Sequence, residues 1–435
     1  MEKYNVKKVT YPLCGTVIVP GSKSMTNRAL LLAALSEEVS ILRGVLFSED
    51  SRHFLDCLIK LGFQLDISED DKTVKIQGAG GKIPKKHAEI NVGSAGTAAR
   101  FITAMLALSK GEYIIQCSQQ MEKRPMEELF KVLTSMGAEF TYLKNQGHLP
   151  VKVKGNRGVC KDITMDISKS TQFLSAMLMV TPMTESGIHI GITSDKKEGS
   201  YIDITRNMLK SFGVTVDFDG ETYHVKGQQQ LHIGDYYIEP DVSAACYFYG
   251  MAALTGGRIT VKNVFSSSMQ GDMKFIKVLE TMGCQVFEEK DGITVAGNFD
   301  GRFQGIDVNM NDFSDQALTL AALAPFATSP TVIRNVGHIR GQECNRMTAI
   351  VTELSKCGIE CKEVGDDIFI KPGMVNPALI ETYEDHRVAM AFTMMGLKAS
   401  GIEISDPLCC RKTFENYYDV LEQLIQDSEY AANMI

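Results

Sequence analysis

The chain of 435 residues lacks the features that mark several broad classes of protein. It has no excess of positive charge, because 45 lysine and arginine residues against 53 aspartate and glutamate residues give a net charge of −8. General nucleic-acid binding and binding to acidic membranes both need a basic surface, so neither is expected. The longest apolar run, near residues 317–327, is too short to span a bilayer, and the first residues, MEKYNVKKV, contain no apolar signal segment. These absences predict a soluble, cytoplasmic protein.

The sequence also lacks the common cofactor and metal motifs. Its 11 cysteines are scattered and include no CxxC pair, which argues against a secreted disulfide framework. It contains no GxGxxG, no GxxxxGK[ST] and no HExxH, so we expect neither a cofactor nor a metal. The composition, 44% hydrophobic and 23% charged, is that of a globular protein, and the length favours two domains.

The most informative feature that is present is an internal repeat. A pattern of Leu, two variable residues, an apolar residue and Gly occurs as LIKLG, LTSMG, LKSFG, LETMG and LSKCG. Its glycines are Gly62, Gly137, Gly213, Gly283 and Gly358, spaced 75, 76, 70 and 75 residues apart. We expect each glycine to end a helix in the left-handed conformation and a β-hairpin to follow it.

The two ends of the chain complete the count. A helix at about 414–425 has no strand pair after it, whereas strands near 6–10 and 15–19 have no helix before them. Together they are expected to form a sixth unit.

Six units divided three and three predict an α/β protein with two similar domains. The first domain would contain residues 20–240, and the second would contain 1–19 together with 241–435. Because ligands often bind at domain interfaces, we expect a site in the cleft between the halves, with Pro20-Gly21 as part of a hinge.

Residues 20–28, PGSKSMTNR, follow an expected strand and precede an expected helix. Such a turn directs free backbone N–H groups outward, and here it carries two cations, Lys23 and Arg28, among hydroxyl and amide side chains. The pattern predicts a binding corner for a small ligand with phosphate and hydroxyl groups. On these residues alone, a capped helix start with solvated charges explains the pattern equally well.

Similar corners recur further along the first half. Residues 92–100, VGSAGTAAR, form a glycine-rich turn in which the backbone at Gly96 could approach an anion. Arg124 precedes a proline at another helix entry, and residues 168–172, SKSTQ, place hydroxyl groups and an amide at a third. Taken singly, these are also ordinary loop chemistry, a solvated charge run and helix capping.

The second half carries the groups suited to acid–base chemistry. They are Asp315 at the start of an apolar helix, Glu343 between cations, and the triplet Asp385, His386 and Arg387. Cations stand at helix entrances throughout the chain: Lys23, Arg28, Arg100, Arg124, Arg346, Arg387 and Lys412. In a protein of negative net charge, this pattern predicts one site for a polyanionic small molecule, with acid–base catalysis.

With these residues in view, the chain resembles the 5-enolpyruvylshikimate-3-phosphate synthases, the enolpyruvyl transferases of the shikimate pathway and aromatic amino-acid biosynthesis. The matching stretches cover essentially the whole length in the family's order: PGSKSMTNRALLLAAL, GSAGTAARF, KRP, STQFLSA, SYIDIT, FSDQALT, QECNR, DHRVAMAF and RKTF. The resemblance implies two domains of three βαβαββ units each, an inverted α/β barrel-like fold with the substrates between the domains. It implies a transferase that moves the enolpyruvyl group of phosphoenolpyruvate to the 5-hydroxyl of shikimate 3-phosphate by addition and elimination. We expect these small molecules as its partners and a monomer.

The resemblance also implies site residues. Those for shikimate 3-phosphate are Lys23, Ser24, Arg28, Ser170, Thr171, Gln172, Tyr201, Asp315, Asn335 and Gln342. Those for phosphoenolpyruvate are Lys23, Gly96, Arg124, Gln172, Arg346, Arg387 and Lys412. Asp315 is the candidate base and Glu343 the candidate acid, with Lys23, His386 and Lys412 assisting. The family inhibitor glyphosate is expected to bind beside Gly96. The chain departs from the family at Ser94, commonly Asn, and at Gln342, often Lys.

Two alternatives share the repeat fold. The UDP-N-acetylglucosamine enolpyruvyl transferases have a GxKN-like first corner and a loop cysteine five residues before their Arg-Pro. Here the corner is GSKS, and Gln119 stands at the cysteine position, with Cys117 out of register. A non-catalytic or RNA-end-processing relative is disfavoured by the acidic balance and by the acid–base residues of the second half.

Overall fold

The computed structural model describes residues 3–156 and 162–434. The chain divides into two compact units: the first unit is Gly21–Glu239, and the second unit combines Met1–Pro20 with Pro240–Ile435. Among the described residues, no helix combines the length and the apolar character needed to cross a membrane.

The described part of the first unit contains three four-stranded sheets, ordered β14-β3-β5-β4, β6-β7-β9-β8 and β10-β11-β13-β12. The strands are β3 (Val39–Arg43), β4 (Gln64–Ser68), β5 (Thr73–Gln77), β6 (His87–Asn91), β7 (Glu112–Gln116), β8 (Glu139–Tyr142), β9 (Val151–Lys154), β10 (Asp162–Met165), β11 (Ile188–Ile192), β12 (Val216–Phe218), β13 (Thr222–Val225) and β14 (Asp235–Tyr237). The helices are α1 (Lys23–Leu35), α2 (Glu49–Lys60), α3 (Gly96–Ala107), α4 (Gln119–Glu122), α5 (Glu127–Ser135), α6 (Gln172–Val180), η1 (Thr181–Met183) and α7 (Ser200–Ser211). Each sheet joins one parallel strand pair to an antiparallel hairpin.

The second unit repeats this plan in two described sheets, ordered β16-β17-β15-β2 and β18-β19-β21-β20. Its third described sheet, β1-β23-β22, has three strands and joins a parallel pair to the antiparallel strand β1. Its strands are β1 (Tyr4–Asn5), β2 (Cys14–Val17), β15 (Arg258–Lys262), β16 (Gln285–Glu289), β17 (Gly292–Ala296), β18 (Asp307–Asn309), β19 (Thr331–Arg334), β20 (Cys361–Val364), β21 (Asp367–Ile370), β22 (Ala378–Ile380) and β23 (Ile402–Ile404). Its helices are α8 (Val242–Thr255), α9 (Met273–Thr281), η2 (Ser314–Gln316), α10 (Ala317–Leu323), η3 (Ala324–Phe326), η4 (Gly337–Gly341), α11 (Arg346–Lys356), α12 (His386–Gly396), η5 (Pro407–Lys412) and α13 (Tyr417–Asn433). The expected α/β fold of two similar halves is therefore observed.

The predicted repeat is confirmed at each of its five glycines. Gly62, Gly137, Gly213, Gly283 and Gly358 have φ values of 94°, 100°, 86°, 114° and 78°. A side chain with a Cβ rarely adopts these values, which is why glycine occupies the position where each helix ends. An antiparallel hairpin follows each glycine, as expected.

The prediction for the chain ends was wrong in its pairing. The first strand is Tyr4–Asn5 rather than 6–10, and β2 pairs with β15 in another sheet instead of joining β1. The segment after β1 makes isolated bonds, from the Val6 N–H to the Ile402 carbonyl and from the Val9 N–H to the Leu397 carbonyl. The last helix starts at Tyr417, and it packs on β2 through a bond from the Cys14 N–H to Ser428 Oγ at 3.0 Å.

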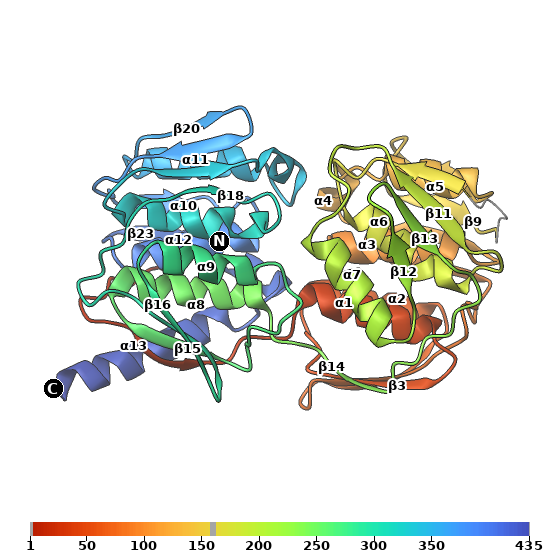
Figure 1. Ribbon diagram of the computed structural model, residues 1–435, viewed down its shortest axis with the longest axis horizontal. Coiled ribbons are helices and arrows are strands. Elements are labelled where there is room, and N and C mark those ends of the chain that lie inside the picture. Colours follow the sequence, from red (N-terminus) through yellow and green to blue (C-terminus); the bar gives the residue numbers. More distant parts are fainter. Residues whose placement is uncertain (1–2, 157–161, 435) are drawn as a thin grey trace. The chain divides into compact units, whose positions relative to one another are not determined.

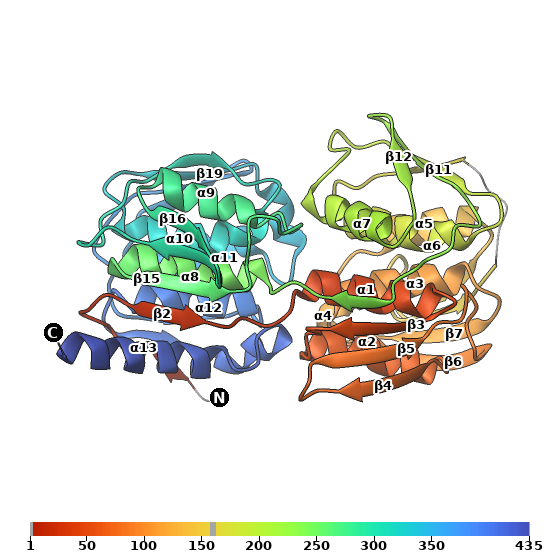
Figure 2. The ribbon, with the colours of Figure 1, turned by 60° about the horizontal axis from the view of Figure 1, so that its bottom comes forward.

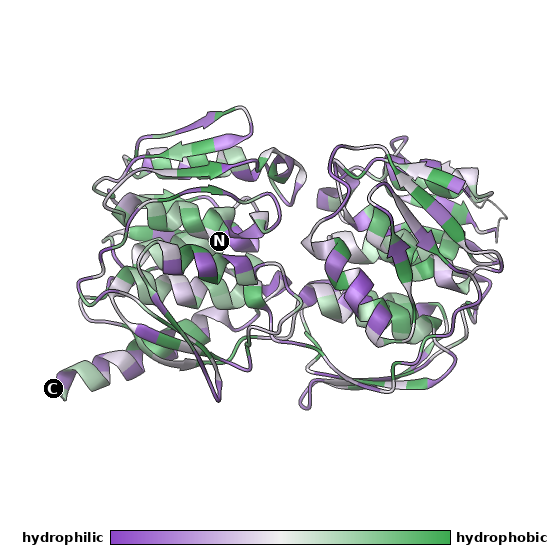
Figure 3. Ribbon diagram, viewed as in Figure 1, coloured by the Kyte–Doolittle hydropathy of each residue, from purple (hydrophilic) through white to green (hydrophobic). Residues whose placement is uncertain are grey.

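Buried helices fill the centre of each unit, with sheets and amphipathic helices around them (Figures 1 and 2). They are α1, α3 and α6 in the first unit and α8, α10 and α12 in the second. Every residue of α3, α8 and α12 is buried. Hydrophobic residues are accordingly concentrated in these central helices, and hydrophilic residues in the outer helices and loops (Figure 3). A helix that is apolar on all sides is stable only when it is enclosed. The polar side chains at its ends are therefore held in fixed surroundings.

Candidate active site

The candidate residues of the first unit gather at the N-terminal ends of α1, α3 and α6. Lys23, Gly96 and Gln172 are the first residues of these helices. Side chains connect the three ends: Asn27 Nδ2 donates to Thr97 Oγ1 at 2.6 Å, and Arg100 Nη1 donates to Gln172 Oε1 at 3.0 Å.

The residues at the N-cap positions of these helices make no side-chain cap bond among the described residues. Within the described chain, the N-cap residues Ser22, Ala95 and Thr171 provide no side-chain acceptor to the helices they precede. The first backbone N–H groups of a helix carry partial positive charge and need acceptors. Three such ends brought together are suited to an anion.

Arg28 is buried, 1% exposed, among neutral acceptors. Its Nε donates to Thr205 Oγ1 at 2.8 Å, and its Nη2 donates to Ser175 Oγ at 3.3 Å and to the Tyr201 carbonyl at 3.0 Å. None of its hydrogen-bond partners in residues 3–156 and 162–434 is a carboxylate. Burial without a counter-charge lowers the pKa of Arg28 to about 10. The side chain thus stays cationic at neutral pH and can attract an anion.

Gly96 lies tightly against two arginines. A Cβ added at Gly96 would lie 2.5 Å from Nη1 of Arg100 and 2.6 Å from Nη1 of Arg124. Both arginines are buried, 2% and 7% exposed. Glycine at this position lets the two guanidinium groups lie against the backbone at the start of α3.

The other predicted residues of the first unit surround the same helix ends. Lys23 Nζ lies 3.4 Å from Asp50 Oδ2, and Ser24 contributes its carbonyl to Arg28 Nη1 at 2.9 Å. Ser170 Oγ accepts from the backbone N–H of Gln172 at 3.3 Å, and Thr171 is the N-cap of α6. Tyr201 takes part through its carbonyl, as the acceptor for Arg28.

Residues that the sequence did not single out complete this region. Ser175 and Thr205 provide the hydroxyl groups around Arg28, and Thr205 Oγ1 also donates to Ser175 Oγ at 3.0 Å. Both lie inside the quoted stretches STQFLSA and SYIDIT, so the signal was present in the sequence.

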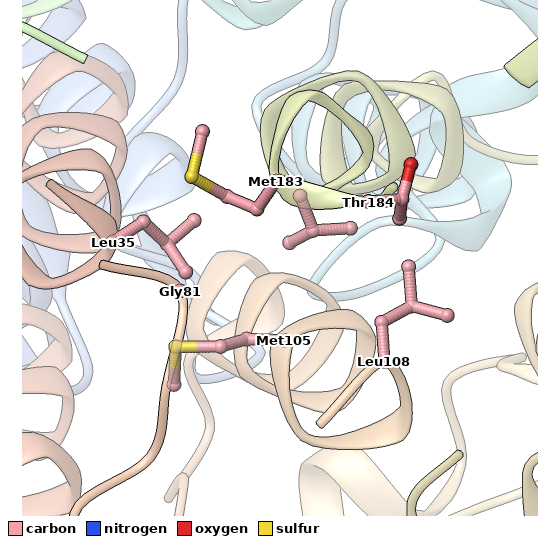
Figure 4. A pocket seen from close by; sticks show the side chains of 7 residues that line it. Leu35, Gly81, Met105, Leu108, Met183 and Thr184 are labelled. Carbon is pink, nitrogen blue, oxygen red and sulfur yellow. The ribbon is translucent and has the colours of Figure 1, made fainter. Parts of the chain in front are cut away.

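The opposite ends of the same three helices are apolar. A cavity of about 20 Å³, room for roughly one water molecule, lies among Leu35, Gly81, Met105, Leu108, Val180, Met183 and Thr184. Figure 4 shows the methionine and leucine side chains gathered around it. None of the described residues that line this cavity is charged, so the N-terminal ends are the better candidate for binding an anion.

The second unit holds a different cluster, centred on Arg346 at the start of α11. This residue is 1% exposed and pairs with three carboxylates at 2.8 Å each: Nε with Asp385 Oδ2, Nη1 with Asp315 Oδ1, and Nη2 with Glu343 Oε2. Burial alone would lower the pKa of Arg346, but Asp385, Glu343 and Asp315 raise it well above its usual value. The cluster therefore keeps Arg346 charged and orients the carboxylates that surround it.

Asp315 also contacts a second arginine. Its Oδ2 lies 2.8 Å from Arg387 Nη2, so its two oxygens face different guanidinium groups. Asp315 belongs to the short η2 helix before α10, and its side chain keeps 14% of its surface exposed. It is thus held firmly but remains accessible.

Asp385 caps α12 by accepting the Arg387 N–H at 2.9 Å, and it is fully buried. His386 Nδ1 lies 3.7 Å from Asp385 Oδ1. The two residues before this cap, Tyr383 and Glu384, have φ values of 55° and 56°. Left-handed conformations at two successive non-glycine residues are strained, and such strain is typical of functional sites.

Lys412, at the end of η5, is 4% exposed, and its Nζ lies 3.9 Å from Glu343 Oε1. Glu343 therefore faces Arg346 on one side and an ammonium group on the other. Asp315, Glu343, Arg346, Asp385, His386, Arg387 and Lys412 form one connected group in the second unit.

Two predicted residues are outside this group. Asn335, exposed and with φ 58°, donates its N–H to Asp367 Oδ1 at 2.9 Å. Gln342 follows η4, and its N–H bonds the Ile339 carbonyl at 3.4 Å. The structure gives neither of them a described contact with the carboxylate cluster.

Comparison with known proteins gives one consistent result. The family model for EPSP synthase (3-phosphoshikimate 1-carboxyvinyltransferase) matches residues 7–421. The 3-phosphoshikimate 1-carboxyvinyltransferase of Trichormus variabilis is 43% identical over 419 residues, covering 96% of this chain and 98% of that protein. The enzyme of the same name from Serratia proteamaculans is 40% identical over 417 residues, covering 95% and 96%.

A solved structure of EPSP synthase from Acinetobacter baumannii covers 98% of both chains with a TM-score of 0.81 at 24% identity. At this identity the likeness supports the fold alone. The family model and the two sequence relatives show more: the chain belongs to the EPSP synthase family, the 3-phosphoshikimate 1-carboxyvinyltransferases.

Proposed function

We propose that this chain transfers the enolpyruvyl group of phosphoenolpyruvate to the 5-hydroxyl of shikimate 3-phosphate and releases phosphate. Family membership supports the reaction. The observation that carries the residue roles is the division of labour between the units. One unit holds cations beside helix starts whose N-cap residues make no side-chain cap bond within the described chain, and the other holds carboxylates among cations.

In the first unit, the helix ends bind anionic groups of both substrates. Lys23, Ser24, Arg28, Ser170, Thr171, Gln172 and Tyr201 contact shikimate 3-phosphate, and Lys23, Gly96, Arg124 and Gln172 contact phosphoenolpyruvate. The neutral surroundings of Arg28 support this role, because no described carboxylate competes with a substrate for its charge.

In the second unit, Asp315 accepts the proton of the 5-hydroxyl as its oxygen attacks C2 of phosphoenolpyruvate. Glu343 donates a proton to the methylene carbon C3, and a tetrahedral adduct forms. Asp315 and Asn335, with Gln342, contact shikimate 3-phosphate, while Arg346, Arg387 and Lys412 hold the donor. Elimination then removes a proton from the former C3 and expels phosphate, whose charge these cations stabilise, with Lys23 and His386 assisting.

The ion pair between Asp315 and Arg387 supports a substrate-dependent activation of the base. A donor anion that binds Arg387 competes with Asp315 for the guanidinium at 2.8 Å. When Arg387 binds the substrate anion in place of Asp315, the Asp315 carboxylate loses a cationic partner and becomes a stronger proton acceptor.

The test is phosphate release from phosphoenolpyruvate with shikimate 3-phosphate as acceptor, compared with UDP-N-acetylglucosamine. We expect release only with shikimate 3-phosphate. Release only with the UDP-sugar would overturn the proposal in favour of the sister family. Glu343→Gln and Asp315→Asn should lower turnover by roughly 10²- to 10⁴-fold while the chain stays folded.

Asp307→Asn is the matched control for these variants, because Asp307 is also a carboxylate paired with an arginine of the second unit but is solvent-exposed. Its turnover should be unchanged. Turnover near the unmodified rate in both site variants would refute the assigned roles.

A further inference from the structure

Asp272 is a buried carboxyl group that the reaction scheme above leaves without a role. It precedes α9 and is 7% exposed. An aspartate before a helix usually accepts a hydrogen bond from the first turn, but in the described chain the Asp272 side chain makes no such bond. Helix capping therefore does not explain why a carboxyl group is buried here.

The Asp272 side chain turns instead toward α8 and η2. Its Oδ2 accepts a short hydrogen bond from Ser243 Oγ and a second one, at 3.2 Å, from Gln316 Nε2. Gln316 is itself fixed, because its Oε1 accepts from Thr319 Oγ1 at 2.9 Å and it is completely buried. The carboxylate is thus held from two helical elements.

Ser243 connects this carboxylate to the candidate donor site. Arg387 Nη2 lies 3.4 Å from Ser243 Oγ and 2.8 Å from Asp315 Oδ2. A guanidinium group can only donate hydrogen bonds, so the Ser243 oxygen accepts from Arg387 and its hydrogen points to Asp272. The hydroxyl group therefore transmits the attraction of the Asp272 carboxylate to Arg387.

The Arg387 guanidinium group is consequently attracted by acceptors on two sides. Asp315 attracts one side of the guanidinium, the Ser243–Asp272 pair attracts it from α8, and Tyr247 Oη lies 3.5 Å from Nη1. Without the second attraction, Arg387 would pair more closely with Asp315 and be less available to a substrate anion.

We propose that Asp272 is a positioning residue that, through the Ser243 hydroxyl, holds Arg387 in the orientation that binds the anionic groups of phosphoenolpyruvate. This inference rests on the proposed function, because it takes Arg387 as a donor-binding residue.

The groups around Asp272 affect its ionisation, so the dependence of substrate binding on pH can test the proposal. Charged and titratable groups face Asp272 from each packed element: Asp241 just before α8, Cys246 on α8, Asp315 on η2 and Arg387 on α12. Burial and the charge of Asp315 raise the pKa of Asp272 to about 7, although Arg387 and Ser243 act in the opposite direction. Its ionised form, which attracts the Ser243 hydroxyl more strongly, therefore increases as the pH rises from 6 to 8.

The experiment compares Asp272→Asn, Ser243→Ala, the double variant and Arg387→Gln with the unmodified chain in steady-state kinetics. We expect Asp272→Asn to raise the KM for phosphoenolpyruvate about tenfold at pH 8, the size of one lost charge-assisted hydrogen bond, with kcat and the KM for shikimate 3-phosphate nearly unchanged. The ratio of this KM to that of the unmodified chain should grow from pH 6 to pH 8. Taking the ratio cancels the titration of the substrate itself.

The double variant should resemble either single variant, because both changes break the same connection. Ser243→Ala also keeps the test valid if Asp272→Asn does not fold. Tyr249→Phe is the matched control: it removes one buried hydrogen bond of α8, from Tyr249 Oη to the Ile293 carbonyl at 3.1 Å, and should leave KM unchanged.

The outcomes separate the two proposals. An unchanged KM in Asp272→Asn and Ser243→Ala, together with a large rise in Arg387→Gln, overturns the positioning role alone. An unchanged KM in Arg387→Gln overturns the donor-binding role of Arg387 and with it this part of the proposed function. A rise of the same size in Tyr249→Phe would show that any loss of packing has this effect, and it would also refute the positioning role.

Discussion

The two units bury their arginines in opposite surroundings. In the first unit, Arg28 is enclosed by hydroxyl and carbonyl oxygens, and burial lowers its pKa to about 10. In the second unit, Arg346 is enclosed by three carboxylates, which raise its pKa well above the usual value against the effect of burial. The first unit leaves the charge of Arg28 for a ligand, whereas the second neutralises the charge of Arg346.

Two central helices of the second unit differ in the same sense from those of the first, although α10 also lacks a side-chain cap among the described residues. In the second unit, Asp241 caps α8 by accepting the Ala244 N–H at 3.1 Å, and Asp385 caps α12. In the described first unit, the N-cap residues of α1, α3 and α6 make no side-chain cap bond, although Ser170 Oγ accepts the Gln172 N–H at the start of α6. A shared repeat thus provides two kinds of half-site, one suited to binding anions and one suited to transferring protons.

Replacing Arg346 and Arg28 in turn should show the largest difference between the two units, measured as the free energy of unfolding. Arg346→Met removes the cation that Asp315, Glu343 and Asp385 share, and Arg387 and Lys412 offset this loss only in part. We expect a loss of about 3–5 kcal/mol in the free energy of unfolding. Arg28→Met should change it by no more than about 1 kcal/mol, because Thr205 Oγ1 still bonds Ser175 Oγ and the Tyr201 carbonyl. Urea denaturation of the two variants measures the difference.

Measuring the binding of shikimate 3-phosphate to the Arg28→Met variant completes this experiment. Arg28→Met should remain stable but bind shikimate 3-phosphate much more weakly, as titration calorimetry would show. Equal losses of stability in the two variants would contradict the proposed division between the units.

The substitution Gly96→Ala tests how strictly binding depends on the positions of Arg100 and Arg124. In Gly96→Ala the added Cβ must displace the guanidinium ends of Arg100 and Arg124, which lie 2.5 and 2.6 Å from its position. We expect glyphosate to inhibit the unmodified chain and its inhibition constant to rise in the variant by at least roughly tenfold, corresponding to about 1.5–3 kcal/mol for a misplaced charge-assisted bond. The stability of the fold should change little, since both obstacles are the ends of flexible side chains. Unchanged inhibition in the variant would refute the steric explanation.

The sequence predicted what depends on local structure. Gly62 and its four counterparts mark helix ends because the left-handed conformation is a property of single residues. The grouping of Lys23, Gly96 and Gln172 followed from their places at helix starts, and the resemblance supplied their functional context.

Contacts between distant segments could not be predicted in the same way. Whether an arginine is neutralised depends on partners such as Asp315 and Asp385, which are 31 and 39 residues from Arg346 in the chain. The pairing of β2 with β15 joins Cys14–Val17 to Arg258–Val261, and no local pattern distinguishes it from pairing with β1. The role inferred for Asp272 has the same origin, because its link to Arg387 exists only through Ser243 on a third element.

The smallest expected effect concerns the helix caps. Asp241→Ala removes the acceptor for the Ala244 N–H at the start of α8, and we expect it to lower the free energy of unfolding by about 1 kcal/mol. Ser22→Ala, at the same position before α1, should cost much less, because the Ser22 side chain makes no cap bond in the described chain. Thermal unfolding of both variants without substrates measures the difference. Equal losses would mean that the Ser22 hydroxyl does serve α1 in solution, and the uncapped helix end would no longer distinguish the first unit from the second.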